Sequence, residues 1–302
     1  MEQVSAVVVT FNRLAKLKTV IASIEAQTFA PTRLIIVDNA STDGTAEYLR
    51  QLTTSIPLEV MSLPTNTGGA GGFSAGMERG YQLGADFVWI MDDDCYPEPD
   101  ALEKLRDGFV SAVAELGPDV PFSCSLVNYI DGAICEMNNP EPTWDWARLV
   151  SKGQRSVMVK SCSFVSVLIP RWVIEKHGLP YSEYFIWFDD HEYTLRITRT
   201  CPGVQVLDSV VVHDMGDNKG VNFGLIDDAN AWKFAYGIRN EASFRLHHQS
   251  LFAYLYLAAR VALMMRRGRV NGALQRKMYG RLLAGIRFNP AVAFPAKTAD
   301  RV

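Results

Sequence analysis

A run of apolar residues, Phe87–Met91, leads without interruption into three aspartates, Asp92, Asp93 and Asp94. Two of the five apolar residues are aromatic and two are β-branched, which is typical of a strand buried on both faces. Adjacent carboxylates repel one another, so a fold keeps them together at a strand end only where solvent, bases or a cation compensates their charge. The pattern therefore predicts an interior β-strand that ends in concentrated negative charge.

We expect a divalent cation to compensate the negative charge of the three aspartates. Mg²⁺ and Mn²⁺ prefer oxygen ligands and are commonly shared between carboxylates and substrate phosphates. Alternate residues of an extended segment point the same way, so Asp92 and Asp94 are predicted to converge on one ion while Asp93 faces elsewhere. The alternative is a solvated acidic turn before Pro97. His213 ends another predicted strand, Val210–His213, and is either structural or a further Mn²⁺ ligand.

The N-terminal residues alternate between strand and helix patterns. Apolar runs at 4–9 and 34–37 flank a helical pattern from Leu14 to Ile24. This spacing is that of a βαβ unit, whose strands are parallel and whose connection is right-handed. Asp38 follows the second strand, at the edge where open α/β sheets bind ligands. It is predicted to accept hydrogen bonds from a ribose or a base, or else to form the turn before a helix near Thr45.

Four glycines, Gly68, Gly69, Gly71 and Gly72, follow a short third strand at 58–63. Glycine backbone can approach a ligand closely and can offer N–H groups to a phosphate. A flexible turn is the alternative, and the segment lacks the GK[ST] sequence of a Walker loop. Because the segment lies one element before the acidic strand end, we expect the phosphate-facing backbone and the cation site to share one crevice.

A second acidic block lies within Tyr184–Arg196, where aromatic residues lead into Asp189 and Asp190 at the start of a predicted helix. A helix N-terminus stabilises a carboxylate, so Asp189 alone could be only an N-cap. Two acidic clusters suit a division of labour in which one binds metal and the other accepts a proton from an attacking hydroxyl. Residues 118–150 show no regular pattern, and we expect Trp144 and Trp146 to pack within that loop rather than to stack on a sugar.

The C-terminal residues differ in charge from the rest. Residues 232–302 hold 13 basic and 2 acidic side chains, although the whole chain has a net charge of -3. The aromatic stretch Leu251–Leu257 and the basic run Arg266–Arg269 fit a helix on an anionic membrane face, and equally a helix docked on the domain or buried in a homo-oligomer. The apolar run 251–265 is too short to span a bilayer comfortably. The motifs indicate no nucleic-acid partner.

Cysteine usage and the N-terminus bear on the cellular compartment. The five cysteines are scattered without metal-binding spacing, which predicts reduced thiols in a cytoplasmic protein. Met1–Val4 has no basic region and no cleavage signal, so we expect no secretion signal. Together with the basic C-terminal segment, these features predict a peripheral location on the inner face of the cell membrane.

Taken together, these motifs resemble those of the inverting family 2 glycosyltransferases with the GT-A fold. More narrowly, the chain resembles the bacterial galactofuranosyltransferases that act on acceptors linked to polyprenyl pyrophosphate. The stretches that carry the resemblance cover most of residues 4–245. They are Val7–Thr10, Ile36–Asn39, Asn66–Phe73, Trp89–Asp94, Phe185–Arg196, His213 and Tyr236–Asn240.

The resemblance implies an α/β catalytic domain at 1–230, with a mostly parallel, Rossmann-like sheet flanked by helices, and a helical extension at 231–302. It implies transfer of galactofuranose from UDP-galactofuranose to a lipid-linked glycan in cell-wall or surface polysaccharide synthesis. Asp92, Asp94 and His213 would hold Mn²⁺ or Mg²⁺. The residues expected to line the donor site are Thr10, Arg13, Asp38, Asn66, Gly68, Gly69, Gly71, Gly72, Asp92 and Asp93.

Asp190 would be the general base by its match to the second acid of the family's motif. Here Phe188 is inserted between Trp187 and the acids, and His191 follows them, so Asp189 is the alternative base. A rhamnosyltransferase that uses dTDP-rhamnose is the close alternative, because both branches share the glycine segment and the Arg-Asn pair. A nucleotidyltransferase fits less well, since Thr10–Arg13 lacks a basic glycine-rich loop. A non-catalytic carbohydrate-binding protein is the third alternative.

Overall fold

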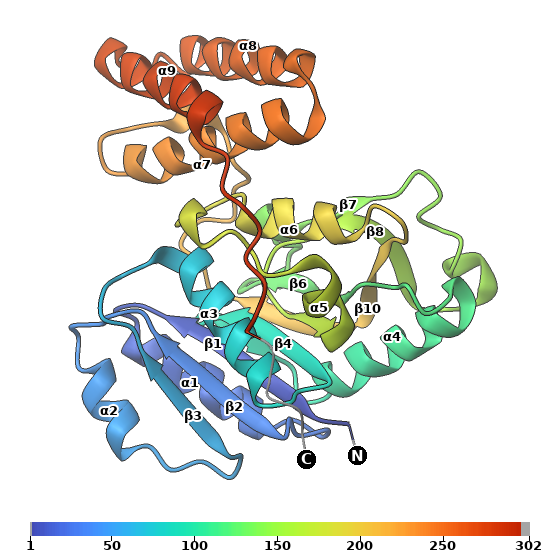
Figure 1. The fold of residues 1–302 in the computed structure, drawn as a ribbon. Coiled ribbons are helices and arrows are strands. Elements are labelled where there is room, and N and C mark those ends of the chain that lie inside the picture. Colours follow the sequence, from blue (N-terminus) through green and yellow to red (C-terminus); the bar gives the residue numbers. More distant parts are fainter. Residues whose placement is uncertain (1, 297–302) are drawn as a thin grey trace.

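A ten-stranded sheet organises the computed structural model, which describes residues 2–296 (Figure 1). Along the sheet the strands follow the order β3-β2-β1-β4-β9-β6-β10-β8-β7, and β5 pairs with β10. The strands are β1 (Val4–Thr10), β2 (Arg33–Asp38), β3 (Leu58–Ser62), β4 (Phe87–Asp92), β5 (Cys95–Pro97), β6 (Ser123–Tyr129), β7 (Glu141–Pro142), β8 (Ser156–Ser161), β9 (Val167–Pro170) and β10 (Gly203–His213).

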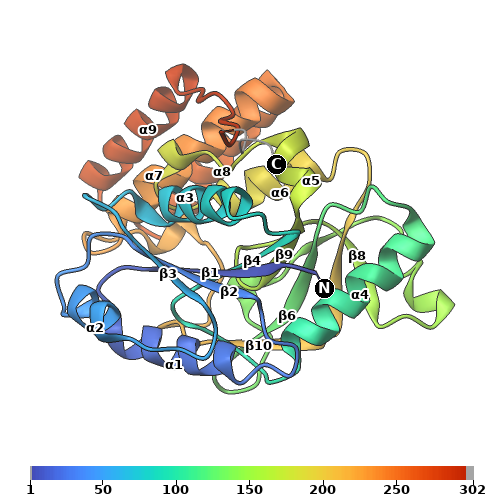
Figure 2. The same ribbon diagram turned by 60° about the horizontal axis from the view of Figure 1, so that its bottom comes forward.

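Helices cover both faces of this sheet (Figure 2). The α-helices are α1 (Leu14–Glu25), α2 (Thr45–Gln51), α3 (Gly68–Gln82), α4 (Ala101–Leu116), α5 (Arg171–His177), α6 (Asp189–Ile197), α7 (Ala231–Phe244), α8 (Leu251–Arg267) and α9 (Gly272–Arg287). The shorter helical segments are η1 (Glu136–Asn138), η2 (Val150–Lys152), η3 (Ser182–Tyr184), η4 (Phe223–Leu225) and η5 (Arg245–Gln249).

The four strands β3, β2, β1 and β4 run parallel, which confirms the predicted βαβ arrangement. Thr10 pairs with Asp38 across β1 and β2, and Val9 pairs with Asp92 across β1 and β4. In a parallel sheet the carboxyl ends of neighbouring strands lie at one edge. The polar residues that follow β1, β2 and β4 are therefore neighbours.

The other half of the sheet is mixed. Strand β9 runs antiparallel to both β4 and β6, whereas β10 runs parallel to β6 and antiparallel to β8. Residues 118–150 were predicted to be irregular, and this was wrong for Ser123–Tyr129, which form β6. The small polar residues Ser123, Ser125 and Asn128 mask the strand pattern, although Ser123 and Ser125 are buried and hydrogen-bonded.

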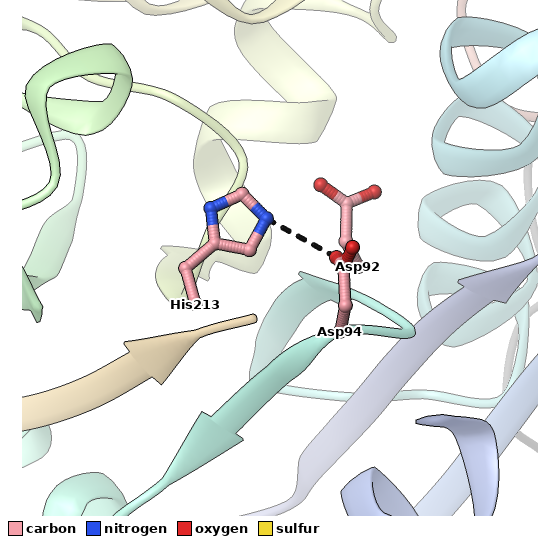
Figure 3. A group of neighbouring side chains, drawn as sticks. All are labelled: Asp92, Asp94 and His213. Carbon is pink, nitrogen blue, oxygen red and sulfur yellow. Dashed lines mark hydrogen bonds and ion pairs between the residues drawn. The ribbon is translucent and has the colours of Figure 1, made fainter. Parts of the chain in front are cut away.

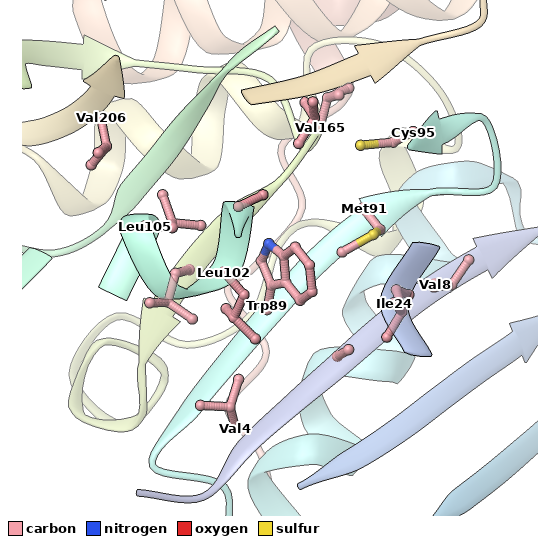
Figure 4. Packing of buried hydrophobic residues seen from close by; sticks show 14 of the residues in the cluster. Val4, Val8, Ile24, Trp89, Met91, Cys95, Leu102, Leu105, Val165 and Val206 are labelled. Atoms are coloured by element: carbon pink, nitrogen blue, oxygen red, sulfur yellow. The ribbon is translucent and has the colours of Figure 1, made fainter. Parts of the chain in front are cut away.

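Strand β4 is buried between two apolar clusters, one on each face of the sheet. Val8, Trp89 and Met91 belong to one cluster (Figure 4). Val88 and Ile90 belong to the other, as expected for side chains that alternate along a strand. Trp89 is fully buried, and its indole N–H donates to Ser166 Oγ at 3.0 Å, so its polar atom keeps a partner. Burial of such a side chain contributes about 1.5–3 kcal/mol to stability.

The last three α-helices form an extension beside the sheet, with α7 between the sheet and α8 and α9 (Figure 1). They share a core that includes Phe234, Ile238, Leu257 and Met278. The chain then returns toward the part of the protein that contains the sheet, where Leu179 N–H donates to the Ala293 carbonyl at 2.8 Å. Within residues 2–296, no helix combines the length and the apolar character that crossing a membrane requires. The division of the chain at residue 230 stays a prediction.

Gly72 makes close packing of α3 on the sheet possible. A Cβ atom at this position would overlap the Val9 side chain, so Gly72→Ala forces either the helix or the strand to shift. We expect this substitution to lower the free energy of unfolding by about 1–3 kcal/mol, as overpacking commonly does. Urea denaturation measures the loss.

Gly280→Ala is the matched control, because it also lies inside a helix but a Cβ there would meet no atom within 4 Å. Alanine in that position removes a helix-interior glycine, so we expect an increase in stability of about 0.5–1 kcal/mol. Equal effects of the two substitutions would contradict the packing role of Gly72.

Candidate active site

Asp92, Asp94 and His213 lie together at the carboxyl edge of the sheet (Figure 3). One ligand atom from each of the three side chains lies within 4.8 Å of the other two. The short strand β5 produces this arrangement, because it reverses the chain just after the acids and pairs Cys95 with His213. The structure brings together the three side chains that were predicted to hold a metal ion, and metal binding itself stays a prediction.

The two carboxyls of this cluster have opposite electrostatic environments. Burial, and then the charges of Asp94 and Asp93, raise the pKa of Asp92 well above its ordinary value. Burial also acts on Asp94, but the hydrogen bond with His213 and the charges of Arg13, His213 and Lys16 outweigh it and lower its pKa. Asp92 is therefore the carboxyl whose ionised form most needs a further cation.

The remaining acid, Asp93, faces β1 and the start of α1 rather than the cluster. Its carboxylate accepts hydrogen bonds from Thr10 Oγ1 at 2.7 Å and from Arg13 Nη1 at 3.1 Å. Arg13 Nη1 also lies 2.5 Å from Asp94 Oδ2, and Lys16 Nζ lies 3.7 Å from the same atom. Thr10, Arg13 and Asp93 were predicted to line the donor site, and in the structure they hold the acidic turn in place.

The donor set fits a divalent cation that accepts mixed ligands. Two carboxylates and one imidazole suit Mn²⁺, whereas Mg²⁺ favours an all-oxygen shell. His213 Nδ1 lies 2.7 Å from Asn138 Oδ1, and His213 Nε2 lies 3.1 Å from Asp94 Oδ1. With the Nδ1 proton donated to Asn138, the proton that a metal ion would replace is the one on Nε2.

Asn138 contacts His213 of the candidate metal site, and the sequence reasoning missed it. It is buried in η1, its Nδ2 donates to Ser163 Oγ at 2.7 Å, and the Cys135 thiol donates to its Oδ1. These contacts orient the amide so that its oxygen faces His213. Asn138 lies in the segment that was predicted to be irregular, 75 residues from His213 along the chain, and no local pattern marks it.

The glycine segment is the first turn of α3 rather than an open loop. Gly68 has φ of 74°, and its N–H and carbonyl are bonded to Asn66 Oδ1 and Asn39 Nδ2, both at 2.8 Å. A side chain at Gly68 would overlap the Phe185 carbonyl, so glycine is required here for conformation and for space. Gly72 packs on Val9, and the phosphate-facing role predicted for the backbone of this segment stays a prediction.

Asp38 is buried at the same edge, and its Oδ1 accepts a hydrogen bond from Ser41 N–H at 3.0 Å. Asp38 therefore forms the turn that was given as the alternative, and its contact with a ribose or base stays a prediction. The N–H group of Ala70, inside the glycine segment, donates to the Phe185 carbonyl at 3.2 Å. The segment is thus joined both to the loop after β2 and to the loop before α6.

Asp189 and Asp190 form the first turn of α6. The N-cap is Phe188, so the interpretation of Asp189 as an N-cap was wrong. Burial, and then the charge of Asp190, raise the pKa of Asp189 well above its ordinary value; burial also raises the pKa of Asp190. The charge of Asp189 contributes to the raised pKa of Asp92, so these two carboxyls lie near enough to interact. Asp190 Oδ1 accepts from His191 N–H at 2.7 Å.

Trp144 and Trp146 do not pack as predicted. Trp144 is 90% exposed and Trp146 is 48% exposed. They follow the two-residue edge strand β7, which offers little apolar surface to cover an indole. The prediction of buried aromatic side chains in this loop was therefore wrong.

The fold and this acidic edge identify the class of protein. Residues 5–115 match the family model described as glycosyl transferase family 2, and the mixed sheet with its flanking helices is that of the GT-A fold. Over this segment the chain is similar to the family 2 glycosyltransferases.

Two of the similar proteins are named galactofuranosyltransferases. The chain is 40% identical over 129 residues to galactofuranosyltransferase GlfT1 of Mycolicibacterium smegmatis, a match that covers 41% of this chain and 40% of that protein. It is 28% identical over 236 residues to GlfT1 of Mycobacterium tuberculosis strain H37Rv, and this match covers 72% of each chain.

Solved structures share the fold at low sequence identity. The crystal structure of S. aureus TarS 1-349 in complex with UDP-GlcNAc has a TM-score of 0.58 at 16% identity, and covers 94% of this chain and 81% of that chain. A structure of GalNAc-T7 with UDP, GalNAc and Mn²⁺ has a TM-score of 0.57 at 14% identity, and covers 81% of this chain and 48% of that one.

Asn138→Ala removes the hydrogen-bond acceptor that fixes the His213 ring. We expect it to weaken Mn²⁺ binding by roughly 10- to 100-fold, the usual effect of losing a residue that orients a metal-ligating histidine. The signal of free Mn²⁺ in electron paramagnetic resonance, titrated against purified protein, measures the affinity.

Asn139→Ala is the control, since Asn139 is the exposed neighbour of Asn138. We expect it to leave Mn²⁺ affinity unchanged. Wild-type affinity in the Asn138 variant would show that the cluster does not depend on this contact.

Proposed function

We propose that the protein is an inverting galactofuranosyltransferase. In this proposal it transfers galactofuranose from UDP-galactofuranose to a hydroxyl of a polyprenyl-pyrophosphate-linked glycan in cell-wall or surface polysaccharide synthesis. The observation that carries the proposal is the cluster of Asp92, Asp94 and His213 at the carboxyl edge of the sheet, with Asp189 near enough for its charge to raise the pKa of Asp92. The name of the relatives supports the choice of sugar.

Different residues of the chain would have different roles in such a reaction. Asp38 and the first turn of α3 lie at the edge where a nucleotide would bind, next to the acidic cluster. The acids at the start of α6 would take the proton of the acceptor hydroxyl, which then attacks the anomeric carbon from the face opposite the leaving UDP. Their raised pKa values bring such a base closer to neutral pH, where a general base is most effective.

Asp92, Asp94 and His213 would hold Mn²⁺ or Mg²⁺, which when bound would neutralise negative charge on the diphosphate. Arg13 and Lys16 already place positive charge against Asp94. They keep the acidic turn compact when its carboxylates are ionised. Arg13 has a side chain that is 47% exposed, so it can move away from Asp94 at little cost in buried contacts.

The test is a donor screen with purified protein and Mn²⁺. We expect UDP release from UDP-galactofuranose in the presence of a polyprenyl-pyrophosphate-linked glycan mimic, with product of inverted anomeric configuration. dTDP-rhamnose is the comparison donor, because the rhamnosyl branch shares the glycine segment. Preference for dTDP-rhamnose would move the protein to that branch, and ligand binding without release of nucleotide would contradict transfer.

Within the same assay, Asp190→Asn should abolish transfer while UDP binding is retained, because an amide cannot accept the proton. Asp189→Asn is the matched comparison, since it removes the neighbouring carboxyl whose charge acts on Asp92. Normal turnover in the Asp190 variant together with loss in the Asp189 variant would assign the base to Asp189.

We further propose that the helical extension brings the protein to the cytoplasmic face of the cell membrane. The start of α8 exposes Leu251, Phe252, Leu255 and Tyr256, and its other end exposes basic side chains, including Arg266 and Arg267. Apolar side chains combined with arginines suit an anionic lipid surface. Helices α8 and α9 lie on the side of α7 that faces away from the sheet, so this surface is not covered by the catalytic half (Figure 1).

Replacing Arg266, Arg267 and Arg269 by Glu should weaken binding to vesicles of phosphatidylglycerol and phosphatidylcholine. Each basic residue near an anionic surface contributes about 1 kcal/mol, so the triple variant should lose more than about 100-fold in binding. Co-sedimentation measures the effect, with phosphatidylcholine vesicles as the uncharged control. Unchanged vesicle binding with an altered oligomeric state would assign the surface to a second copy of the chain.

A further inference from the structure

The loop before the acids of α6 has an unusual backbone conformation. Phe185, Trp187 and Phe188 all have positive φ, at 67°, 64° and 75°. Residues with side chains rarely adopt this region, because the side chain crowds the backbone there. A loop of this kind persists only when its surroundings hold it firmly. Because Phe188 is also the N-cap of α6, its conformation determines where Asp189 and Asp190 point.

Asn240 of α7 makes many of the hydrogen bonds that keep the loop in this conformation. Its side chain is fully buried, and Nδ2 donates to three backbone carbonyls of the loop. The distances are 2.9 Å to Tyr184 O, 3.2 Å to Ile186 O and 2.8 Å to Trp187 O. One amide therefore fixes the direction of the chain at three points between η3 and α6.

Arg239 orients this amide. Its Nη2 and Nε donate to Asn240 Oδ1 at 2.8 and 3.1 Å, which satisfies the buried oxygen and leaves Nδ2 directed at the loop. Arg239 Nη2 also donates to the Glu183 carbonyl at 2.8 Å. The guanidinium in turn lies over the Phe288 ring, 3.7 Å from its centroid.

Side-chain packing brings α7 close enough for these bonds. Gly237 faces the Trp187 indole, and a Cβ atom there would lie 2.9 Å from the ring. Phe185 stacks on Tyr236 with ring centroids 4.7 Å apart. The loop is therefore matched to the surface of α7 by both packing and hydrogen bonds.

The opposite side of the loop contacts the glycine segment. The Phe185 carbonyl accepts from Ala70 N–H at 3.2 Å, and the absence of a side chain at Gly68 allows this approach. The loop thus lies between α7 and the first turn of α3. The extension is linked through it to both the acids and the predicted nucleotide edge.

We propose that Asn240, oriented by Arg239, is a positioning residue that holds the strained loop 184–188 and so aims Asp189 and Asp190 at the reacting hydroxyl. The assignment of the acids rests on the proposed function, whereas the hold on the loop does not. The helical extension then helps to position the acids of the active site, in addition to any role at a membrane.

The test measures both amide hydrogen exchange and enzyme kinetics in the Asn240→Ala variant. The Glu192 amide donates to the Phe188 carbonyl at 2.9 Å and the Ile186 amide to the Tyr184 carbonyl at 2.8 Å, so both report on the loop. We expect these amides to exchange faster while those of β1 and β4 keep their protection. We also expect kcat to fall by about 100-fold, the effect of a misplacement of about 1 Å, with UDP affinity unchanged.

Asn230→Ala is the matched control at the other end of the same helix. It removes hydrogen bonds of similar length, from Asn230 Nδ2 to the Leu225 carbonyl and from Asp227 N–H to Asn230 Oδ1, both at 2.9 Å. We expect faster exchange only near residues 225–230, with kcat unchanged. Arg239→Lys is the milder second variant, expected to change the same loop amides to a smaller extent, and it is informative if Asn240→Ala does not fold.

The outcomes separate the two proposals. Unchanged loop exchange in both the Asn240 and Arg239 variants would overturn the hold on the loop, whatever the enzyme transfers. Faster loop exchange with unaltered kcat would overturn the positioning role. Faster loop exchange in a protein without any sugar transfer would leave the hold on the loop in place and contradict the proposed function.

Discussion

The mutual repulsion of carboxylates at the end of β4 is the constraint on which the site depends. A strand buried on both faces delivers Asp92, Asp93 and Asp94 to one edge of the sheet, and three negative charges there require compensation. Arg13 and Lys16 from α1 and the turn before it supply part of the compensation, and His213 from β10 supplies another part. The compensation is unequal. The pKa of Asp94 is lowered and that of Asp92 is raised, so the ionised form of Asp92 is the less compensated of the two.

The second constraint is conformational. The acids of α6 follow a loop in which Phe185, Trp187 and Phe188 have positive φ, and such a backbone is stable only when other parts of the protein hold it. Helix α7 does so from one side and the start of α3 from the other. The clustered carboxylates and the strained loop thus lie at one edge of the sheet. Residues far from the acids in sequence determine the positions of both acidic groups.

Much of the fold and part of the site could be predicted from local patterns. The parallel strands β1, β2, β3 and β4 are predicted by apolar runs of the right length, and the acids that end β4 by their position in the sequence. Strand β6 could not be predicted, because its buried serines are satisfied by hydrogen bonds from distant segments. Asn138 was missed for the same reason, since its partner His213 lies 75 residues away.

The sequence by itself determined which chemical groups stand at the ends of the strands, because apolar periodicity fixes the residue at which a buried strand stops and therefore the side chains just beyond it. Only the tertiary structure decided how these groups are used. Thr10, Arg13 and Asp93 form a network that holds the acidic turn, and Gly72 serves packing against Val9. The physical reason is that hydrogen bonds, ion pairs and close packing depend on distances between segments, which local sequence patterns do not contain.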